Sequence, residues 1–346
     1  MSSIELTSVR DAHKFDEAVL SAYMQDHVEG FSGPIEVRQF EGGQSNPTFQ
    51  LRTPNKTYVL RKQPPGELLK SAHQVDREYR VMHALRDTKV PVPTMYCLCE
   101  DKSILGTIFY IMDFVEGRVF TDPTMPDSNP EERRGVYLNL ASILGELHSL
   151  RPEQVGLEEF GRPGNYYARQ INRWGKQWLA SKTEELPAMD KLLTWLPDNI
   201  PDDDQSGIVH GDYRLGNVLV SPNDPSISAV LDWELSTLGH PLGDLAYLCQ
   251  AYAGVSSSGN PLPSNYQDFG VPAEKEMLDT YCAASGRGAI ENWDFYVIFN
   301  MFRSASIIQG VYKRGLDGNA SSELALGFKD TARQISDAGL QRLNAL

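Results

Sequence analysis

The chain has 346 residues, of which 41% are hydrophobic and 23% are charged, and its formal net charge is −14. This length allows a sizeable core and predicts two domains or lobes. The acidic balance argues against a nucleic-acid partner, because binding the phosphate backbone requires concentrated Lys and Arg. No stretch approaches the roughly 20 apolar residues that span a bilayer, so we expect no membrane insertion.

The N-terminus and the cysteines bear on the cellular compartment. The N-terminal segment MSSIELTSVRDAHKFDEAV lacks the apolar core of a secretory signal. Cys97 and Cys99 are spaced to lie on one face of a strand, which favours buried reduced thiols over a metal or redox site. Cys249 and Cys282 have no paired metal spacing either. We therefore expect a cytoplasmic protein.

The first part of the chain has the pattern of one helix followed by strands. An amphipathic helix is expected over residues 11–28, with Phe15, Val19 and Tyr23 on one stripe. Three strands separated by turn residues are expected to form an antiparallel meander, at residues 35–40, 48–52 and 57–62. A helix over residues 75–85 and a strongly apolar strand over residues 108–115 follow.

The character of the chain changes near Val115-Glu-Gly117, after which helical patterns dominate. Helices are expected at residues 130–150, 166–183, 188–196 and 242–252, and over most of the chain from residue 272 onward. The sequence therefore predicts an α+β protein. Its two parts would be a small antiparallel-sheet lobe, residues 1–115, and a larger, mainly helical lobe, residues 116–346.

The most informative motif is His210-Gly-Asp212 with Asn217, followed by an apolar run that ends at Asp232. A strand, a turn and a second strand would bring Asp232 back to the loop that carries Asp212. In Mg-ATP phosphotransferases one Asp accepts the proton of the attacking hydroxyl, while an Asn and a second Asp hold the Mg²⁺ ions. The pattern predicts Asp212 as the base and Asn217 and Asp232 as metal ligands. The structural alternative is an ordinary β-turn, with Asp232 capping a neighbouring helix.

Three further residues belong to this motif. Arg214 projects from the same loop as Asp212 and is expected to neutralise charge on the transferring phosphoryl group. His210 is expected to support the loop by hydrogen bonding. Asp244 is interpreted either as the N-cap of a helix or as a buried carboxylate that accepts hydrogen bonds from backbone N–H groups of the loop.

The turn Glu41-Gly-Gly-Gln-Ser-Asn46 is the candidate nucleotide loop. Gly42 and Gly43 would let the backbone approach phosphates closely, and Ser45 or Asn46 can donate hydrogen bonds to them. The turn lacks both the Walker Gly-Lys-Ser/Thr and the three glycines of protein kinases. A plain hairpin turn would suit the same residues, and only the position between two strands favours a nucleotide loop.

A cation from the strand at residues 57–62 is expected to contact the α- and β-phosphates of ATP, and Glu78 is expected to pair with it. Arg61 and Lys62 point to opposite faces of a strand, so only one of them can take this role. Counting along the strand favours Arg61, whereas a one-residue shift would select Lys62. A solvent-facing charge pair is the structural alternative for either residue.

The strand that ends in Met112-Asp-Phe-Val115 occupies the position of a hinge that contacts adenine. The carbonyl of Asp113 and the N–H of Val115 are expected to bond the base edge. An ordinary core strand is the alternative, because backbone groups leave no trace in a sequence.

With these residues the chain resembles the aminoglycoside phosphotransferase-like (choline kinase-like) family of the protein-kinase-like fold. The resemblance rests on His210-Gly-Asp212, Asn217, Asp232-Trp-Glu and Gly243-Asp244, and it covers nearly the whole chain. It implies a kinase that uses ATP and Mg²⁺, with Asp212 as the catalytic Asp and with Asn217 and Asp232 as the metal ligands. The Asp-Phe-Gly and Ala-Pro-Glu pair of protein kinases is missing.

The stretches YVLRKQPPGELLKSAHQVDREYRVMHAL and VHGDYRLGNVLV are more specifically similar to the kinase domain fused to acyl-CoA dehydrogenases. This similarity implies a hydroxyacyl-CoA thioester as the small-molecule hydroxyl substrate. Arg303, Lys313 and Arg314 are then candidate cations for the CoA moiety, or simply a solvated basic face. An aminoglycoside, sugar or amino-alcohol acceptor is the alternative, and a silent nucleotide-binding module is the second. The sequence leaves the oligomeric state open.

Overall fold

The computed structural model describes residues 6–41, 46–66, 73–255, 261–319 and 323–346. The chain forms two compact units. The first runs to Thr121 and also takes in residues 155–157 and 215–236, whereas the second comprises residues 122–154, 158–214 and 237–346. The first unit thus extends past the boundary expected at residue 115. It also includes residues 215–236, which carry Asn217 and Asp232.

A six-stranded antiparallel sheet forms the centre of the first unit, with the strand order β1-β2-β3-β4-β6-β5 in the described part of the chain. Its strands are β1 Leu6–Thr7, β2 Glu36–Phe40, β3 Thr48–Arg52, β4 Thr57–Lys62, β5 Met95–Cys99 and β6 Phe109–Asp113. The expected meander is therefore part of a larger sheet. Cys97 and Cys99 on β5 are buried free thiols, as the sequence predicts.

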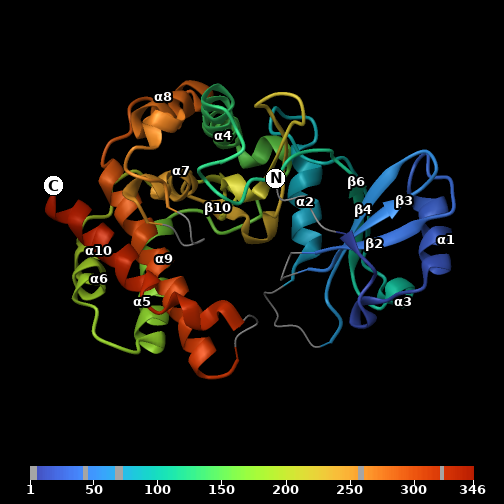
Figure 1. The fold of residues 1–346 in the computed structure, drawn as a ribbon, viewed down its shortest axis with the longest axis horizontal. Helices are drawn as coiled ribbons and strands as arrows, with labels where there is room; N and C mark the ends of the chain where they lie inside the picture. The colour runs from blue at the N-terminus through green and yellow to red at the C-terminus, as the bar shows by residue number, and fades with distance from the viewer. Residues whose placement is uncertain (1–5, 42–45, 67–72, 256–260, 320–322) are drawn as a thin grey trace. The chain divides into compact units, whose positions relative to one another are not determined.

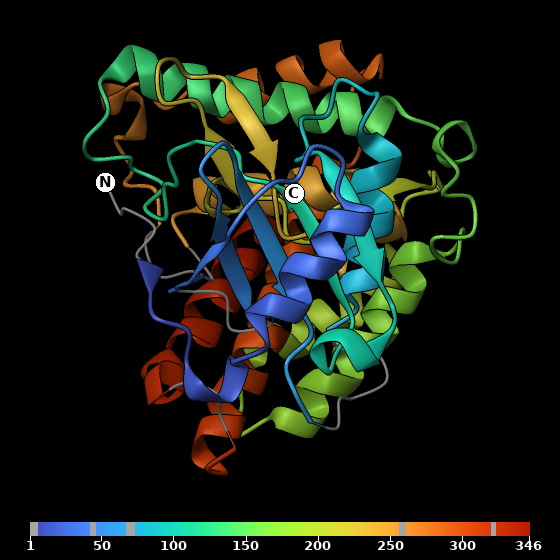
Figure 2. The same ribbon diagram turned by 90° about the vertical axis from the view of Figure 1, so that its right-hand side faces the viewer.

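Two helices cover opposite faces of this sheet, α1 Glu17–His27 and α2 Val75–Leu85 (Figures 1 and 2). Tyr58 and Leu60 of β4 pack with Leu20 and Met24 of α1 in one buried cluster. Since side chains alternate along a strand, Arg61 projects to the other face, where α2 lies. The face that bears α2 therefore carries the charged residues discussed below.

The helix expected over residues 11–28 is shorter than predicted. A 3-10 turn covers Asp11–His13, and α1 begins only after Asp16, whose carboxylate accepts hydrogen bonds from the N–H groups of Ala18 and Val19. This is ordinary N-capping. Of the expected stripe, Phe15 and Tyr23 pack against the core, but Val19 is 38% exposed. Leu20 and Met24 are the fully buried residues of α1.

A short hairpin of the first unit, β8 Val218–Val220 and β9 Ile227–Val230, follows a 3-10 turn at Leu215–Asn217. The backbone of Arg118 pairs with Val220, which attaches the hairpin to the segment after β6. Gly117 is required at this contact, because a Cβ there would lie 2.7 Å from that of Leu219. The hairpin is thereby fixed within the first unit.

The second unit is mainly helical, as predicted. Its helices are α4 Pro130–Ser149, α5 Tyr166–Ser181, α6 Pro187–Asp198, α7 Leu242–Cys249, α8 Glu274–Ser285, α9 Trp293–Leu316 and α10 Thr331–Asn344. The mostly buried α9 packs against α5 and α10 (Figure 1). Two short strands, β7 Gly207–Val209 and β10 Thr237–Gly239, pair antiparallel beside the helices.

The long periodic helices of the second unit begin and end close to their predicted limits. By contrast, α7 stops at Cys249 and continues only as a 3-10 turn, and the chain from residue 272 onward contains α8, α9 and α10. Among the residues that the structure describes, no helix is long and apolar enough to cross a membrane.

Candidate active site

Arg61 and Glu78 form a buried ion pair in the first unit. Arg61 Nε lies 2.9 Å from Glu78 Oε2, and the two side chains are 13% and 1% exposed. Lys62 projects to the opposite face, where its Nζ lies 3.4 Å from the carbonyl oxygen of Leu105 and 5.3 Å from the centre of the Phe15 ring. The structure therefore pairs Arg61, and not Lys62, with Glu78.

Two neutral donors complete the surroundings of Glu78. Asn46 Nδ2 donates to Glu78 Oε1 at 2.9 Å, and the Tyr110 hydroxyl donates to Oε2 at 3.1 Å. Burial raises the pKa of Glu78, and the Arg61 charge opposes this rise. Burial alone would lower the pKa of Arg61, but the Glu78 charge raises it. With a cation and two donors around the carboxylate, we treat the pair as ionised.

Asp232 is joined to the same ion pair. Arg61 Nη2 donates to Asp232 Oδ1 at 3.0 Å, and the Asp232 side chain is 36% exposed. Its backbone φ of +64° is unusual for a residue with a side chain. Such strain is found at functional sites, where the surrounding structure imposes it. Arg61 thus links the helix carboxylate Glu78 to a carboxylate that remains accessible.

Asn217 lies at the same end of the β8–β9 hairpin as Asp232. Val218 pairs with Val230, so the residues that precede β8 and follow β9 are neighbours. The N–H of Leu231 donates to the carbonyl of Asn217 at 2.9 Å. The hairpin therefore places Asn217 and Asp232, which are fifteen residues apart in the chain, at neighbouring backbone positions.

These two side chains suit Mg²⁺ better than a softer metal. Among the described residues, no group of three or more His, Cys, Asp or Glu is arranged to hold a metal ion. Mg²⁺ takes hard oxygen donors, often only one or two from the protein, and completes its octahedron with phosphate and water. An Asn amide oxygen and a partly exposed Asp carboxylate are donors of this kind.

In the second unit, the loop after β7 is held by a buried carboxylate. Asp244 Oδ2 accepts from the N–H of His210 at 2.6 Å, and Oδ1 accepts from the N–H of Gly211 at 2.9 Å. Gly211 has a φ of +85°, which favours glycine. Of the two interpretations of Asp244, the buried carboxylate is confirmed. The N-cap is wrong, because Pro241 caps α7 and no side chain does so.

His148 of α4 supports Asp244 from behind. Its Nε2 lies 3.5 Å from Asp244 Oδ2, and its Nδ1 lies 3.0 Å from the Tyr281 hydroxyl of α8. Burial would raise the pKa of Asp244, but the hydrogen bond and charge of His148 lower it below its ordinary value. Sequence reasoning missed His148, and its only signal was a histidine on the predicted helix at residues 130–150.

The loop alternates buried and accessible side chains. Tyr213 is buried, and its hydroxyl donates to the carbonyl of Leu140 in α4 at 3.0 Å. Asp212 and Arg214 on either side are 25% and 38% exposed, and Arg214 Nε lies 3.5 Å from Asp212 Oδ2. His210 is fully buried, and its Nδ1 accepts from the N–H of Asp212 at 3.2 Å. The anchored loop thus presents a carboxylate and a guanidinium together.

The remaining predicted nucleotide contacts stay predictions. Gly42, Gly43 and Ser45 lie outside the described residues, and the Asn46 side chain is buried against Glu78. Asp113 ends β6, where its carboxylate lies 3.3 Å from Lys56 Nζ.

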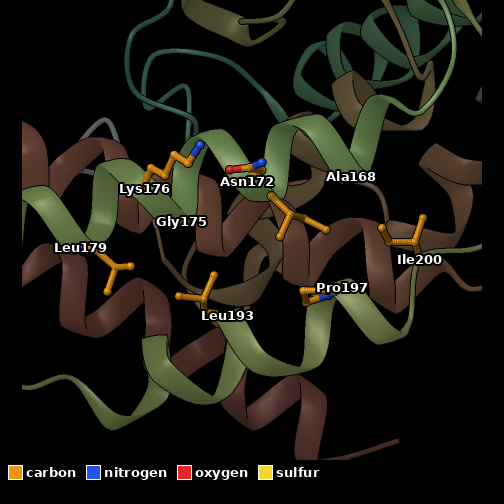
Figure 3. A pocket seen from close by; sticks show the side chains of 9 residues that line it. Ala168, Asn172, Gly175, Lys176, Leu179, Leu193, Pro197 and Ile200 are labelled. Atoms are coloured by element: carbon orange, nitrogen blue, oxygen red, sulfur yellow. The ribbon is translucent and has the colours of Figure 1, made fainter.

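A separate cavity of about 430 Å³ opens between α5 and α6 of the second unit (Figure 3). Leu179 of α5 and Leu193 and Pro197 of α6 contribute to its apolar lining. None of the predicted site residues lines it, and it has no carboxylate. This cavity is therefore distinct from the loop that carries Asp212 and Arg214.

Comparisons with known proteins agree on the type of domain. A family model described as "Phosphotransferase enzyme family" matches residues 36–295. An Arabidopsis thaliana protein named "Probable acyl-CoA dehydrogenase IBR3" is 45% identical over 339 residues, which cover 92% of this chain and 41% of that protein. The chain spans less than half the length of the curated relatives it matches.

Solved structures agree with the family match. A crystal structure from Ralstonia eutropha JMP134, named as a candidate aminoglycoside phosphotransferase, is 45% identical with a TM-score of 0.88 and covers 96% of this chain and 99% of that one. A ternary complex of the aminoglycoside phosphotransferase APH(4)-Ia with ADP and hygromycin B has a TM-score of 0.62 at 14% identity. It covers 94% of this chain and 98% of that one, and shows a shared fold alone. The protein-kinase-like phosphotransferase fold expected from the sequence is confirmed.

Proposed function

Because this chain belongs to the phosphotransferase enzyme family, we propose that it transfers the γ-phosphoryl group of ATP to the hydroxyl of a hydroxyacyl-CoA thioester. The observation that carries the chemistry is the buried Arg61–Glu78 ion pair that also holds Asp232. A strand cation fixed by a helix glutamate, beside a metal-binding Asp, is the arrangement that kinases use for the phosphates of ATP.

The residues have separable roles in this reaction. Asp212 orients the acceptor hydroxyl and takes its proton, as the hydroxyl oxygen bonds to the γ-phosphorus and the bond to the β–γ bridging oxygen breaks. ADP leaves with that oxygen. Arg214 neutralises charge on the transferring group, and Arg61 holds the α- and β-phosphates. Asn217 and Asp232 would hold Mg²⁺, which neutralises phosphate charge when it is bound.

The choice of acceptor rests on the names of similar proteins, and the choice of an active enzyme rests on the residues of the motif. The Arabidopsis relative is named for acyl-CoA chemistry, which supports a CoA thioester. The Ralstonia structure is named for aminoglycosides, so an aminoglycoside, sugar or amino alcohol is the second candidate. A silent nucleotide-binding module is disfavoured, because Asp212, Asn217 and Asp232 are all present.

ADP release measured with Mg²⁺ and a panel of acceptors tests the proposal. The panel is a 4-hydroxyacyl-CoA, the free hydroxy acid, kanamycin, choline and a hexose, with Asp212→Ala as the control. We expect Asp212-dependent turnover of the thioester. If kanamycin, choline or the hexose is turned over and the thioester is not, the proposed thioester acceptor is wrong. Mg-ATP binding without turnover of any acceptor would favour the silent module.

A further inference from the structure

Arg303 of α9 lies beside the loop after β7 that carries Asp212, here called the catalytic loop. Its Nη2 donates to the carbonyl oxygen of Gly211 at 2.9 Å, one residue before Asp212. The left-handed conformation of Gly211 is part of the loop geometry that presents this carbonyl. A guanidinium therefore stands close to the loop that carries the proposed base.

Two aromatic rings hold the Arg303 guanidinium in place. Its carbon Cζ lies 5.8 Å from the centre of the Trp174 ring and 5.4 Å from that of Tyr247. Arg173 also lies over Trp174, with Cζ 5.0 Å from the ring centre. Trp174 itself is fixed by a hydrogen bond from Nε1 to Gln170 at 2.9 Å. Arg173 and Arg303 thus both contact the ring of Trp174, whose position is set by a hydrogen bond.

Neither of these arginines forms an ion pair with a carboxylate among the described residues. Within the part of the chain that the structure describes, neither Arg303 nor Arg173 has an Asp or Glu oxygen within 4.0 Å, whereas Arg287 and Arg342 are paired. Burial raises the pKa of Tyr166. The charges of Arg303, Arg169 and Arg173 oppose that rise, and the charge of Asp244 adds to it. Three guanidinium groups and one carboxylate thus act on Tyr166, in a protein whose net charge is −14.

The cavity between α5 and α6 does not explain these arginines. Ile171, Gly175 and Leu179 line that cavity, and helical periodicity places Arg173 and Trp174 on a different face of α5. The two arginines share Trp174, and Arg303 also contacts Gly211 of the catalytic loop.

We propose that Arg303 and Arg173, held on Trp174, bind an anionic group of the acceptor, a phosphate or a carboxylate, next to the catalytic loop. This inference rests on the proposed phosphotransferase function and makes the acceptor an anion. A guanidinium already fixed by a carbonyl and two rings loses little freedom when it binds an oxyanion, and its planar fork matches phosphate and carboxylate geometry. A polycationic aminoglycoside would be repelled at this position.

Four acceptors distinguish the sources of the anion: a 4-hydroxyacyl-CoA, its dephospho-CoA analogue, the free hydroxy acid and the uncharged N-acetylcysteamine thioester. The variants are Arg303→Lys, Arg303→Gln and Arg173→Gln. Lys275→Ala of α8 serves as the control, because Lys275 Nζ pairs with Asp279 Oδ2 at 2.6 Å and has no proposed role in binding.

We expect Arg303→Gln to raise KM for the anionic acceptors by about tenfold to a hundredfold, the effect of losing one charge-assisted hydrogen bond. KM for ATP and kcat/KM for the uncharged thioester should stay close to wild type. Arg303→Lys should restore part of the loss, and Arg173→Gln, which changes an exposed side chain, should show a weaker effect of the same kind. If KM rises only for the full CoA ester, the bound anion is its 3′-phosphate. If KM also rises for the free hydroxy acid, the bound anion is a carboxylate.

If Arg303→Gln lowered kcat equally for all four acceptors, the inference would be wrong. Arg303 would then only hold the loop backbone through its hydrogen bond to Gly211. Unchanged KM values would overturn it as well. Calorimetric titration with CoA, the acid and the uncharged thioester separates this test from that of the proposed function. Arg303-dependent binding of an anion without turnover would remove the kinase proposal and leave the anion site.

Discussion

At the scale of single residues, Arg61 pairs with Glu78 and Asp232, whereas the neighbouring Lys62 lies against the carbonyl of Leu105. Arg61 and Lys62 are adjacent, and alternation along a strand fixes only that they point to opposite faces. Which face meets Glu78 depends on the packing of α2, a tertiary fact that the local pattern does not contain. The apolar face instead surrounds Lys62, and burial there lowers the pKa of Lys62.

This difference predicts opposite effects of two neighbouring substitutions on nucleotide binding. Arg61→Lys keeps a cation near Glu78 but loses the fork that also reaches Asp232, so Mg-ATP affinity should fall about tenfold or more. Lys62→Met removes a buried charge from the other face and should leave that affinity unchanged. Isothermal titration with Mg-ATP measures both, and equal losses in the two variants would contradict the proposed role of Arg61.

The supporting side chains could not be predicted. His148 and Tyr110 contact Asp244 and Glu78 from elements far away in the sequence. A histidine on a helix and a tyrosine in an apolar strand are common in any core, so neither carries a local signal. The motif residues Asp212 and Asp232 stand out because their spacing has a chemical meaning that core residues lack.

At the scale of elements, the loop after β7 depends on a carboxylate from α7. Asp244 accepts hydrogen bonds from two consecutive N–H groups, which fixes the loop backbone ahead of Asp212. Asp244→Asn removes the charge and replaces one acceptor oxygen by a donor. We expect kcat to fall about tenfold to a hundredfold, because small displacements of a reacting group have effects of this size.

Steady-state kinetics with the purified variant test this prediction. KM for ATP should change little, since Asp244 supports the loop rather than the phosphates. A thermal melt distinguishes loss of geometry from loss of fold. Unchanged kcat in a folded Asp244→Asn protein would show that the loop holds its conformation without this carboxylate.

The contact of α4 with α8 predicts an effect on stability. A Cβ built on Gly145 would lie 2.7 Å from that of Ala284 and 2.8 Å from the Tyr281 carbonyl oxygen. Gly145→Ala should therefore force the helices apart and lower the free energy of unfolding by about 1–3 kcal/mol. Gly288→Ala is the matched control, because a Cβ there has open space. Chemical denaturation compares the two, and equal stabilities would contradict the account of this contact.

Element prediction succeeded where a strong local pattern coincided with tertiary structure. β3, β4 and α2 have their predicted limits. The 11–28 helix was predicted too long because Asp16 was not recognised as a cap. Of its predicted stripe, Phe15 and Tyr23 pack against the core, but Val19 does not. The β7–β10 pair was not predicted as a pair, since three-residue strands depend on partners distant in sequence.

At the scale of the whole molecule, one buried histidine predicts how stability depends on pH. His240 stacks on Tyr296 and is 1% exposed. Burial lowers its pKa to about 4, although Asp203, 3.6 Å away, opposes this shift. Arg287, which pairs with Asp203, also disfavours the protonated form.

The lowered pKa of His240 fixes the direction in which the free energy of unfolding changes with pH. Below a pH of about 6.5 the unfolded chain binds a proton at His240, whereas the folded protein does not until about pH 4. The free energy of unfolding should therefore decrease as the pH falls through this window, by up to about 3 kcal/mol, and should be independent of His240 above it. Denaturation of wild type and His240→Gln at several pH values measures this. Gln keeps an acceptor for the N–H of Leu242, and identical pH dependence in both proteins would contradict the assignment.

The central claim is that this chain transfers phosphate from ATP with Asp212 as the group that takes the proton. The most direct measurement incubates γ-³²P-labelled ATP, Mg²⁺ and a 4-hydroxyacyl-CoA with wild type and with the isosteric Asp212→Asn. Mg-ATP binding is measured on the same samples. Label should appear in the thioester only with wild type, while both proteins bind Mg-ATP with similar affinity. Equal labelling by the two proteins would contradict the claim.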